Sequence, residues 1–186
     1  ERYGRKIIDI IKEKFAFITE DLGYNISCEV LNTVDYGVPE NRERVFVVGI
    51  RKDLDIEWNY PIAIKGDKLT IKDAISDLPT VSEGKNITVY NTQPQNDYQR
   101  LMRGENKVLT EHYCGVYGDK IRTVIQNVKQ GEGKEDFNKL VESGVIDKKY
   151  RLTSGYKNTY GRLIENIPAP TITNNMTAPS GLRCMI

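Results

Sequence analysis

Residues 35–51 are the stretch on which the fold assignment depends, and they read Asp35-Tyr36-Gly37-Val38-Pro39-Glu40-Asn41-Arg42-Glu43-Arg44-Val45-Phe46-Val47-Val48-Gly49-Ile50-Arg51. A Gly-Val-Pro turn leads into two arginines two positions apart, and the apolar run 45–50 is typical of a buried strand. Residues two apart in an extended chain face the same side, so Arg42 and Arg44 should project together. Two guanidinium groups held this way suit a phosphate or a base edge. On spacing alone, a solvated strand edge with one surface salt bridge explains the pattern equally well.

The composition of the 186 residues is that of a globular protein, with 39% hydrophobic and 28% charged residues. This length allows one domain, or one and a half small ones, with a real core. No apolar run approaches the ~20 residues of a membrane span, and the start of the chain has no signal-peptide pattern. Because the first residue is not methionine, we expect the chain to begin inside a longer protein.

The three cysteines (Cys28, Cys114, Cys184) and the single histidine, His112, are scattered along the chain. They form no Cys-x-x-Cys pair, so a zinc site is not expected. A reducing, cytoplasmic setting is the expected location.

Charge is distributed unevenly along the chain, although the formal net charge is only +1. Residues 148–186 contain six basic residues and one acidic residue, a net charge of +5, which leaves −4 for residues 1–147. A basic tail on a mildly acidic body is what a one-sided DNA-contacting surface requires. Solvated lysines without a common role are the alternative explanation.

The hydrophobic periodicity predicts an α/β protein. Residues 3–22 have helical spacing and are followed by Gly23 as a stop, whereas residues 24–34 alternate like a strand. The short connection from there to the strand 45–50 contains no predicted helix, so the two strands should be antiparallel neighbours. Further short helices are predicted at 69–78 (after an N-cap at Thr70), 98–109, 121–128 and 136–142.

Aromatic and basic side chains alternate among small polar residues in the stretch 150–186, an arrangement that could line a DNA groove. The residues of this stretch that we predict to contact DNA are Ser154, Tyr156, Lys157, Asn158, Tyr160 and Arg162. For the two tyrosines, half-buried packing is the alternative.

The block 35–51 closely resembles a signature block of the DNA cytosine-5 methyltransferases, the one summarised as Gln-x-Arg-x-Arg. Glu40 stands where that family usually has Gln. Two later segments are also similar to family blocks: Thr-Ile-Lys-Asp-Ala-Ile-Ser-Asp-Leu-Pro at 70–79 and Pro-Ala-Pro-Thr-Ile-Thr at 168–173. In the last of these the family carries a Thr-(Leu/Ile/Val) pair near the DNA, which adds Thr171 and Thr173 to the expected DNA contacts.

The resemblance implies a fold and a division of the chain. Residues 1–52 would be the last part of the catalytic domain: a helix and an antiparallel hairpin that end the doubly wound, S-adenosylmethionine-dependent methyltransferase sheet. Residues 53–186 would be a small mixed target-recognition domain.

Several elements that this family needs are missing from the sequence. There is no Phe-x-Gly-x-Gly loop for S-adenosyl-L-methionine, no Pro-Cys nucleophile and no Glu-Asn-Val carboxylate. The family adds a cysteine thiolate to carbon 6 of a flipped cytosine, so that carbon 5 can accept a methyl group. By resemblance, Arg44 would hydrogen-bond the 2-oxo oxygen of that cytosine, and Arg42 would support the pocket or a phosphate. The cysteine and the carboxylate would have to come from elsewhere.

The resemblance therefore implies a part of a restriction-modification methyltransferase that is inactive alone. Its expected partners are double-stranded DNA and the remainder of the methyltransferase chain, with self-association possible through open sheet edges. The alternative is a non-catalytic DNA-binding specificity module, or a methyltransferase relic, that acts with a partner chain. A generic α/β interaction domain would make the long family-like blocks a coincidence.

Overall fold

The computed structural model describes residues 5–19, 22–157, 159–172 and 178–181. The chain divides into two compact units, one of residues 1–37 with 42–66 and one of residues 38–41 with 67–186. We call these the hairpin unit and the helical unit. The functional division predicted at 52/53 stays a prediction, and residues 53–66 belong to the hairpin unit because they bond to the hairpin. For example, the Ile64 amide donates to the Asp35 carbonyl over 2.8 Å, and the Tyr60 hydroxyl donates to the Phe46 carbonyl over 3.1 Å.

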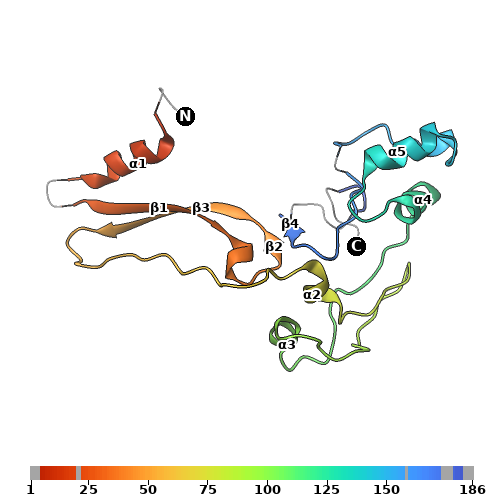
Figure 1. Cartoon of the computed structure of the whole chain (residues 1–186), viewed down its shortest axis with the longest axis horizontal. Coiled ribbons are helices and arrows are strands. Elements are labelled where there is room, and N and C mark those ends of the chain that lie inside the picture. Colours follow the sequence, from red (N-terminus) through yellow and green to blue (C-terminus); the bar gives the residue numbers. More distant parts are fainter. Residues whose placement is uncertain (1–4, 20–21, 158, 173–177, 182–186) are drawn as a thin grey trace. The chain divides into compact units, whose positions relative to one another are not determined.

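The hairpin unit is built from α1 (Ile7–Ala16), β1 (Tyr24–Asn32) and β3 (Glu43–Arg51). β1 and β3 pair antiparallel from Tyr24↔Arg51 to Asn32↔Glu43, which confirms the predicted pairing. The connection does contain a helical turn, η1 (Thr33–Tyr36), so the expectation of a helix-free connection is wrong. Asn32 caps this turn, and Gly37 ends it with a φ of 78°, a conformation that favours glycine. Figure 1 shows α1 lying along the hairpin.

The first helix is much shorter than predicted. It ends at Ala16, and Phe17 is already extended. The isolated bridge Thr19↔Leu22 then turns the chain toward β1. Gly23 is needed for a close approach rather than as a helix stop, because a Cβ there would lie 2.1 Å from the Ala16 carbonyl oxygen.

The prediction of a buried strand at 45–50 is wrong for this structure. Val45 is 62% exposed and Phe46 is 47% exposed. A two-stranded sheet has two faces, and in the described part of this unit α1 is the one helix of more than a single turn that packs on it. The apolar side chains therefore remain largely accessible to solvent.

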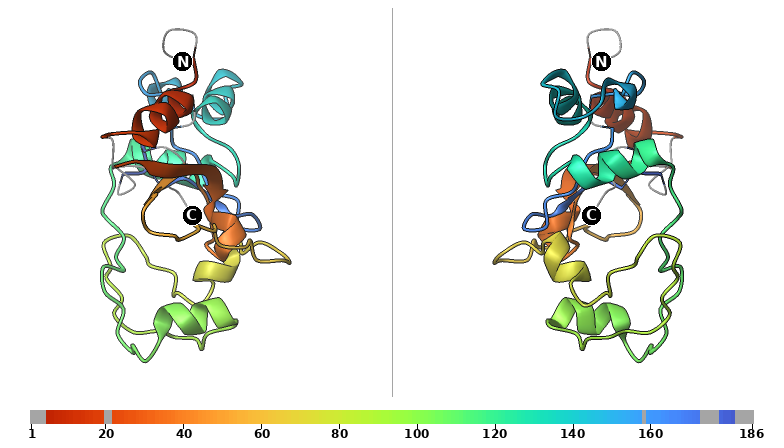
Figure 2. Two further views of the ribbon diagram at one scale, coloured as in Figure 1. Left: turned by 90° about the vertical axis from the view of Figure 1, so that its left-hand side faces the viewer. Right: turned by 90° about the vertical axis from the view of Figure 1, so that its right-hand side faces the viewer.

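The helical unit contains the predicted short helices. They are α2 (Ile71–Ile75), α3 (Asp97–Arg103), α4 (Asp119–Asn127) and α5 (Lys134–Glu142). A 3-10 turn that was not predicted, η2 (Lys148–Tyr150), follows them. The predicted N-cap is confirmed: Thr70 and Asp73 form a reciprocal capping box at the start of α2. α3 is shorter than the predicted 98–109 because Gly104 ends it with a φ of 52°. Figure 2 shows α2 and α3 stacked on each other in both views.

Two kinds of interior hold the helical unit together. An apolar core joins α4, α5 and the chain after them, and its buried members are Val124, Val128, Phe137, Val141, Ile146 and Leu152. Around α2 and α3 the interior is polar. Arg103 and Asp77, only 10% and 5% exposed, form an ion pair of 2.5 Å. The Gln99 amide group donates to the Asp73 carbonyl and the Ser76 hydroxyl, each over 2.9 Å.

A two-stranded parallel pairing lies in the same unit. β2 (Glu40–Asn41) pairs with β4 (Ala169–Pro170), with Glu40 opposite Ala169. Within the part of the chain that the structure describes, no helix is long and apolar enough to cross a membrane.

Candidate nucleic-acid interface

The backbone of Arg42 is held at the point where β1 ends and β3 begins. The Asn32 side-chain oxygen accepts hydrogen bonds from the amides of Arg42 (3.1 Å) and Val34 (3.4 Å). The Thr33 amide donates to the Arg42 carbonyl over 3.2 Å. Sequence reasoning did not select Asn32, although an asparagine at the end of a strand and before a turn is a typical cap.

Arg44 lies within β3, opposite Leu31 in the strand register, and its side chain is exposed. Its Nη1 donates to the backbone carbonyl of Glu43 over 2.6 Å. The contact is to the backbone and not to the Glu43 carboxylate, and the alternative of a solvated strand edge with a surface salt bridge stays open. The guanidinium group is oriented locally and still accessible to a ligand.

The second set of predicted residues lies at the β2–β4 pairing. The Thr171 hydroxyl donates to the carbonyl of Asn41 over 3.1 Å, and Asn41 directly precedes Arg42 in the chain. The Ile172 amide donates to a carboxylate oxygen of Glu40 over 2.8 Å. Thr173 lies outside the described residues.

The loop after Leu152 presents Tyr156 to solvent at 79% exposure. The hydroxyl of Thr159, which is only 6% exposed, donates to the Tyr156 carbonyl over 2.7 Å. The Lys134 ammonium group on α5 donates to the Gly155 carbonyl over 2.9 Å, and Gly155 has a φ of 91°. This loop is therefore fixed from inside while its tip projects. Ser154 is also exposed, and Asn158 lies outside the described residues.

Tyr160 and Arg162 lie on the inner side of the same segment. Tyr160 packs against the apolar core and has a φ of 55°, so half-buried packing describes it, and Tyr156 alone of the two tyrosines projects. The Arg162 guanidinium donates to the carbonyl oxygens of Val128 (2.7 Å) and Ile125. These bonds link the segment to the end of α4, and the DNA contact predicted for Arg162 stays a prediction.

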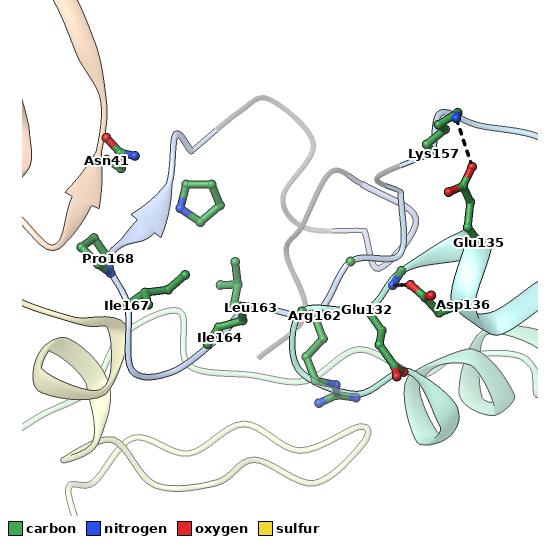
Figure 3. Close-up of a pocket in the computed structure, with 14 residues that line it drawn as sticks. Asn41, Glu132, Glu135, Asp136, Lys157, Arg162, Leu163, Ile164, Ile167 and Pro168 are labelled. Atoms are coloured by element: carbon green, nitrogen blue, oxygen red, sulfur yellow. Dashed lines mark hydrogen bonds and ion pairs between the residues drawn. The ribbon is translucent and has the colours of Figure 1, made fainter.

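Figure 3 shows the cavity beside these elements, which has a volume of about 460 Å³. Asn41, Pro168 and Pro170 line it from the β2–β4 pairing, and carboxylates line it from the start of α5. Lys157 lies at the rim, 3.5 Å from the Glu135 carboxylate. A hydrogen bond from Lys139 holds the pKa of Asp136 below its usual value. The carboxylates at this rim are thus paired with lysines, Glu135 with Lys157 and Asp136 with Lys139.

The turn Gly131-Glu132-Gly133 in front of α5 is the one place where a glycine-rich loop meets a helix start next to the cavity. Its amides are used within the chain: the Gly131 amide donates to the Arg162 carbonyl over 3.0 Å, and the Gly133 amide donates to Asp136 over 3.2 Å. No strand precedes the turn in the described residues. These residues do not fit a cofactor-binding loop.

The comparisons with known proteins identify the class of protein. The family model described as C-5 cytosine-specific DNA methylase matches residues 2–179. The chain therefore belongs to the C-5 cytosine-specific DNA methylase family, whose members generally use S-adenosylmethionine.

Curated relatives agree with this family. The Type II methyltransferase M.NgoPII of Neisseria gonorrhoeae is 30% identical over 156 residues, which cover 76% of this chain and 42% of the relative. M.DdeI of Desulfomicrobium norvegicum is 34% identical over 130 residues, covering 67% of this chain and 30% of the relative. M.MthTI of Methanothermobacter thermautotrophicus is 44% identical over 79 residues, or 38% of this chain and 24% of the relative. The chain spans less than half the length of these relatives.

A solved structure shares the fold. It is a prophage-encoded Escherichia coli protein described as a DNA modification methyltransferase, with a TM-score of 0.57 at 19% identity. The match covers 88% of this chain and 47% of that one.

Proposed function

We propose that this chain is the target-recognition part of a DNA cytosine-5 methyltransferase and also carries the arginine block of its cytosine pocket. One observation carries the proposal: the family match spans residues 2–179 and includes Arg42 and Arg44. The Pro-Cys nucleophile and the Phe-x-Gly-x-Gly loop are absent from the 186 residues. The remainder of the methyltransferase then supplies the nucleophile and S-adenosyl-L-methionine, and this chain alone transfers no methyl group.

In this proposal Arg44 acts on the flipped cytosine. Its guanidinium group donates hydrogen bonds to the 2-oxo oxygen and stabilises the charge that shifts onto the ring during attack. Arg42 supports the same pocket or a phosphate. Support comes from the backbone bonds that fix Arg42 at Asn32 and from the exposure of the Arg44 side chain.

Duplex DNA contacts the projecting loop and the segment after it. Tyr156 offers an aromatic face, and Lys157 offers a charge that can exchange its ion pair with Glu135 for a phosphate. Ser154, Asn158, Thr171 and Thr173 complete the proposed contacts. The loop is tied to α5 through Lys134, so its tip is pre-ordered before it meets DNA. A cytoplasmic location is part of the same proposal.

The hairpin unit is the part that we expect to dock on the rest of the methyltransferase. In the described residues β1 and β3 pair only with each other, and Val30, Val45 and Phe46 are largely exposed. Unpaired strand edges and exposed apolar faces are typical of surfaces that bind another protein segment. Without the remaining chain, self-association through the same surface is expected, and sedimentation at rising concentration measures it.

A domain exchange tests the proposed function. Residues 1–179 of this chain replace the aligned segment of M.NgoPII, and bisulfite sequencing of plasmid DNA records methylated cytosines. We expect methylation at a site that differs from that of unmodified M.NgoPII, and none from the 186 residues alone. Arg44→Ala in the exchanged protein is the inactive control.

The same experiment distinguishes the second candidate, a non-catalytic DNA-binding specificity module acting with a partner chain. The absence of any Pro-Cys nucleophile from the sequence favours that candidate. An exchanged protein that folds and binds duplex DNA but never methylates, while unmodified M.NgoPII does, overturns the catalytic role of the arginine block.

A further inference from the structure

The carboxylate of Glu40 bonds to a backbone amide far along the chain. One of its oxygens accepts the amide of Ile172 over 2.8 Å. Two neighbouring bonds run between the same segments: the Ala169 amide donates to the Pro39 carbonyl over 2.8 Å, and the Thr171 hydroxyl donates to the Asn41 carbonyl over 3.1 Å. Residues 169–172 are thus laid along residues 39–41.

The backbone pairing at this place is very short. β2 and β4 have two residues each, far fewer than a strand needs for independent stability. Pro170 has no amide hydrogen, so it cannot donate to the ladder. Two side chains, those of Glu40 and Thr171, add hydrogen bonds to this short backbone register.

We propose that Glu40 is a positioning residue, which orients Thr171 and Ile172 for contact with DNA. A carboxylate that accepts a backbone amide makes a stronger bond than a neutral acceptor, and here it extends the two-residue pairing to Ile172. Gln at this position would offer an amide oxygen in the same place and keep the acceptor. The DNA step of this inference rests on the proposed function, whereas the positioning step does not.

Hydrogen exchange tests the positioning step on the whole 186-residue chain. The exchange rate of the Ile172 amide is measured by NMR in wild type and in Glu40→Ala, Glu40→Gln and Glu165→Ala. Glu165 lies in the same unit with an exposed side chain, so its variant removes an equal charge without touching the pairing. We expect Ile172 to exchange at least about tenfold faster in Glu40→Ala only.

DNA affinity tests the consequence, with a cytosine-containing duplex of random sequence at low salt. Loss of a negative charge by itself strengthens DNA binding, so Glu165→Ala and Glu40→Gln should bind as tightly as wild type or more tightly. Glu40→Ala should bind about fivefold more weakly, the equivalent of one net hydrogen bond. Loss of positioning weakens DNA binding, whereas loss of a negative charge strengthens it, so the direction of the change in affinity distinguishes the two effects.

The outcomes are distinct. Unchanged Ile172 exchange in Glu40→Ala overturns the inference. Faster exchange with DNA affinity equal to that of Glu40→Gln overturns the link to DNA and leaves the proposed function standing. A wild-type chain that binds no duplex contradicts the proposed function, and the exchange rates still decide whether Glu40 holds the pairing.

Discussion

The hairpin unit and the helical unit are built on opposite principles. In the hairpin unit β1 and β3 form a long ladder, yet Val45 and Phe46 on β3 are largely exposed and α1 contains no buried residue. In the helical unit the helices are short, but Phe137 is completely buried and Arg103 pairs with Asp77 in the interior. The difference teaches that regular backbone pairing and burial are separate properties. The helical unit contains a buried apolar core, whereas the hairpin unit leaves apolar side chains of its strands exposed.

The largest expected effect follows from the apolar core. Phe137→Ala should lower the free energy of unfolding by about 3–5 kcal/mol, because it leaves a cavity among fully packed side chains. Phe46→Ala on the exposed strand is the matched control and should cost less than ~1 kcal/mol. Urea denaturation followed by far-UV circular dichroism measures both. The fluorescence of Trp58, the single tryptophan, follows the hairpin unit in the same samples. Equal costs for the two substitutions would break the comparison.

The second effect concerns activity and lies in the hairpin unit. In the exchanged methyltransferase, Arg44→Ala should reduce turnover by about 10²–10³-fold, the range for loss of one donor to a developing charge. The urea midpoint should stay unchanged because this side chain is exposed. Arg51→Ala, which removes another exposed arginine from the end of the same strand, should leave turnover unaltered. Similar losses for both arginines would show that the strand is merely disturbed.

A third, smaller effect is a difference in stability between substitutions at the N-termini of α2 and α1. Thr70→Ala should cost about 1 kcal/mol, because it removes half of the capping box at α2. Lys6→Ala is the matched control, since α1 begins there without a side-chain cap bond, and it should change the free energy of unfolding by less than ~0.5 kcal/mol. Thermal unfolding of the two variants beside wild type measures this difference.

The smallest effect is a pH dependence in the helical unit. A hydrogen bond from Arg122, supported by one from the Tyr117 amide, lowers the pKa of Glu83 from 4.5 to about 2. A depressed pKa means that the contribution to stability is complete above pH 4.5 and is lost as pH falls toward about 2. The urea midpoints of wild type and Glu83→Gln should therefore differ at neutral pH and converge through this window. A difference that stays constant down to about pH 2 would contradict the linkage.

Much of the local structure could be predicted from the sequence because it depends on neighbours in the chain. The alternation before residue 35 and the apolar run after Arg44 located two strands, and Thr70 marked the start of α2. The error at the first helix has a local cause too, because periodicity cannot detect that Gly23 must approach the Ala16 carbonyl. The error on the buried strand has another cause. An apolar run shows that a strand has side chains suited to burial, but it does not show that another element packs on them.

The functional residues divide in the same way. Arg42 and Arg44 were selected from spacing and from resemblance to a family block, and their roles stay predictions. The family itself is established by the match over residues 2–179. Asn32 was not selected although its cap of the following turn is local, and the bond of Glu40 could not be predicted because its partner Ile172 lies 132 residues away. Arg162 was selected for its charge, but its guanidinium bonds to two backbone carbonyls near the end of α4.

The sequence by itself therefore determined the family, the antiparallel pairing, the short helices and the arginine block, since each depends on residue types within one short segment. Only the tertiary structure showed that the Arg162 guanidinium donates to backbone carbonyls, that Tyr156 projects into solvent, and that the Glu40 carboxylate accepts the Ile172 amide. These outcomes depend on distances between segments that are far apart in the sequence. The type of a side chain determines which bonds the residue can form, and the folded chain determines which partner lies close enough to form them.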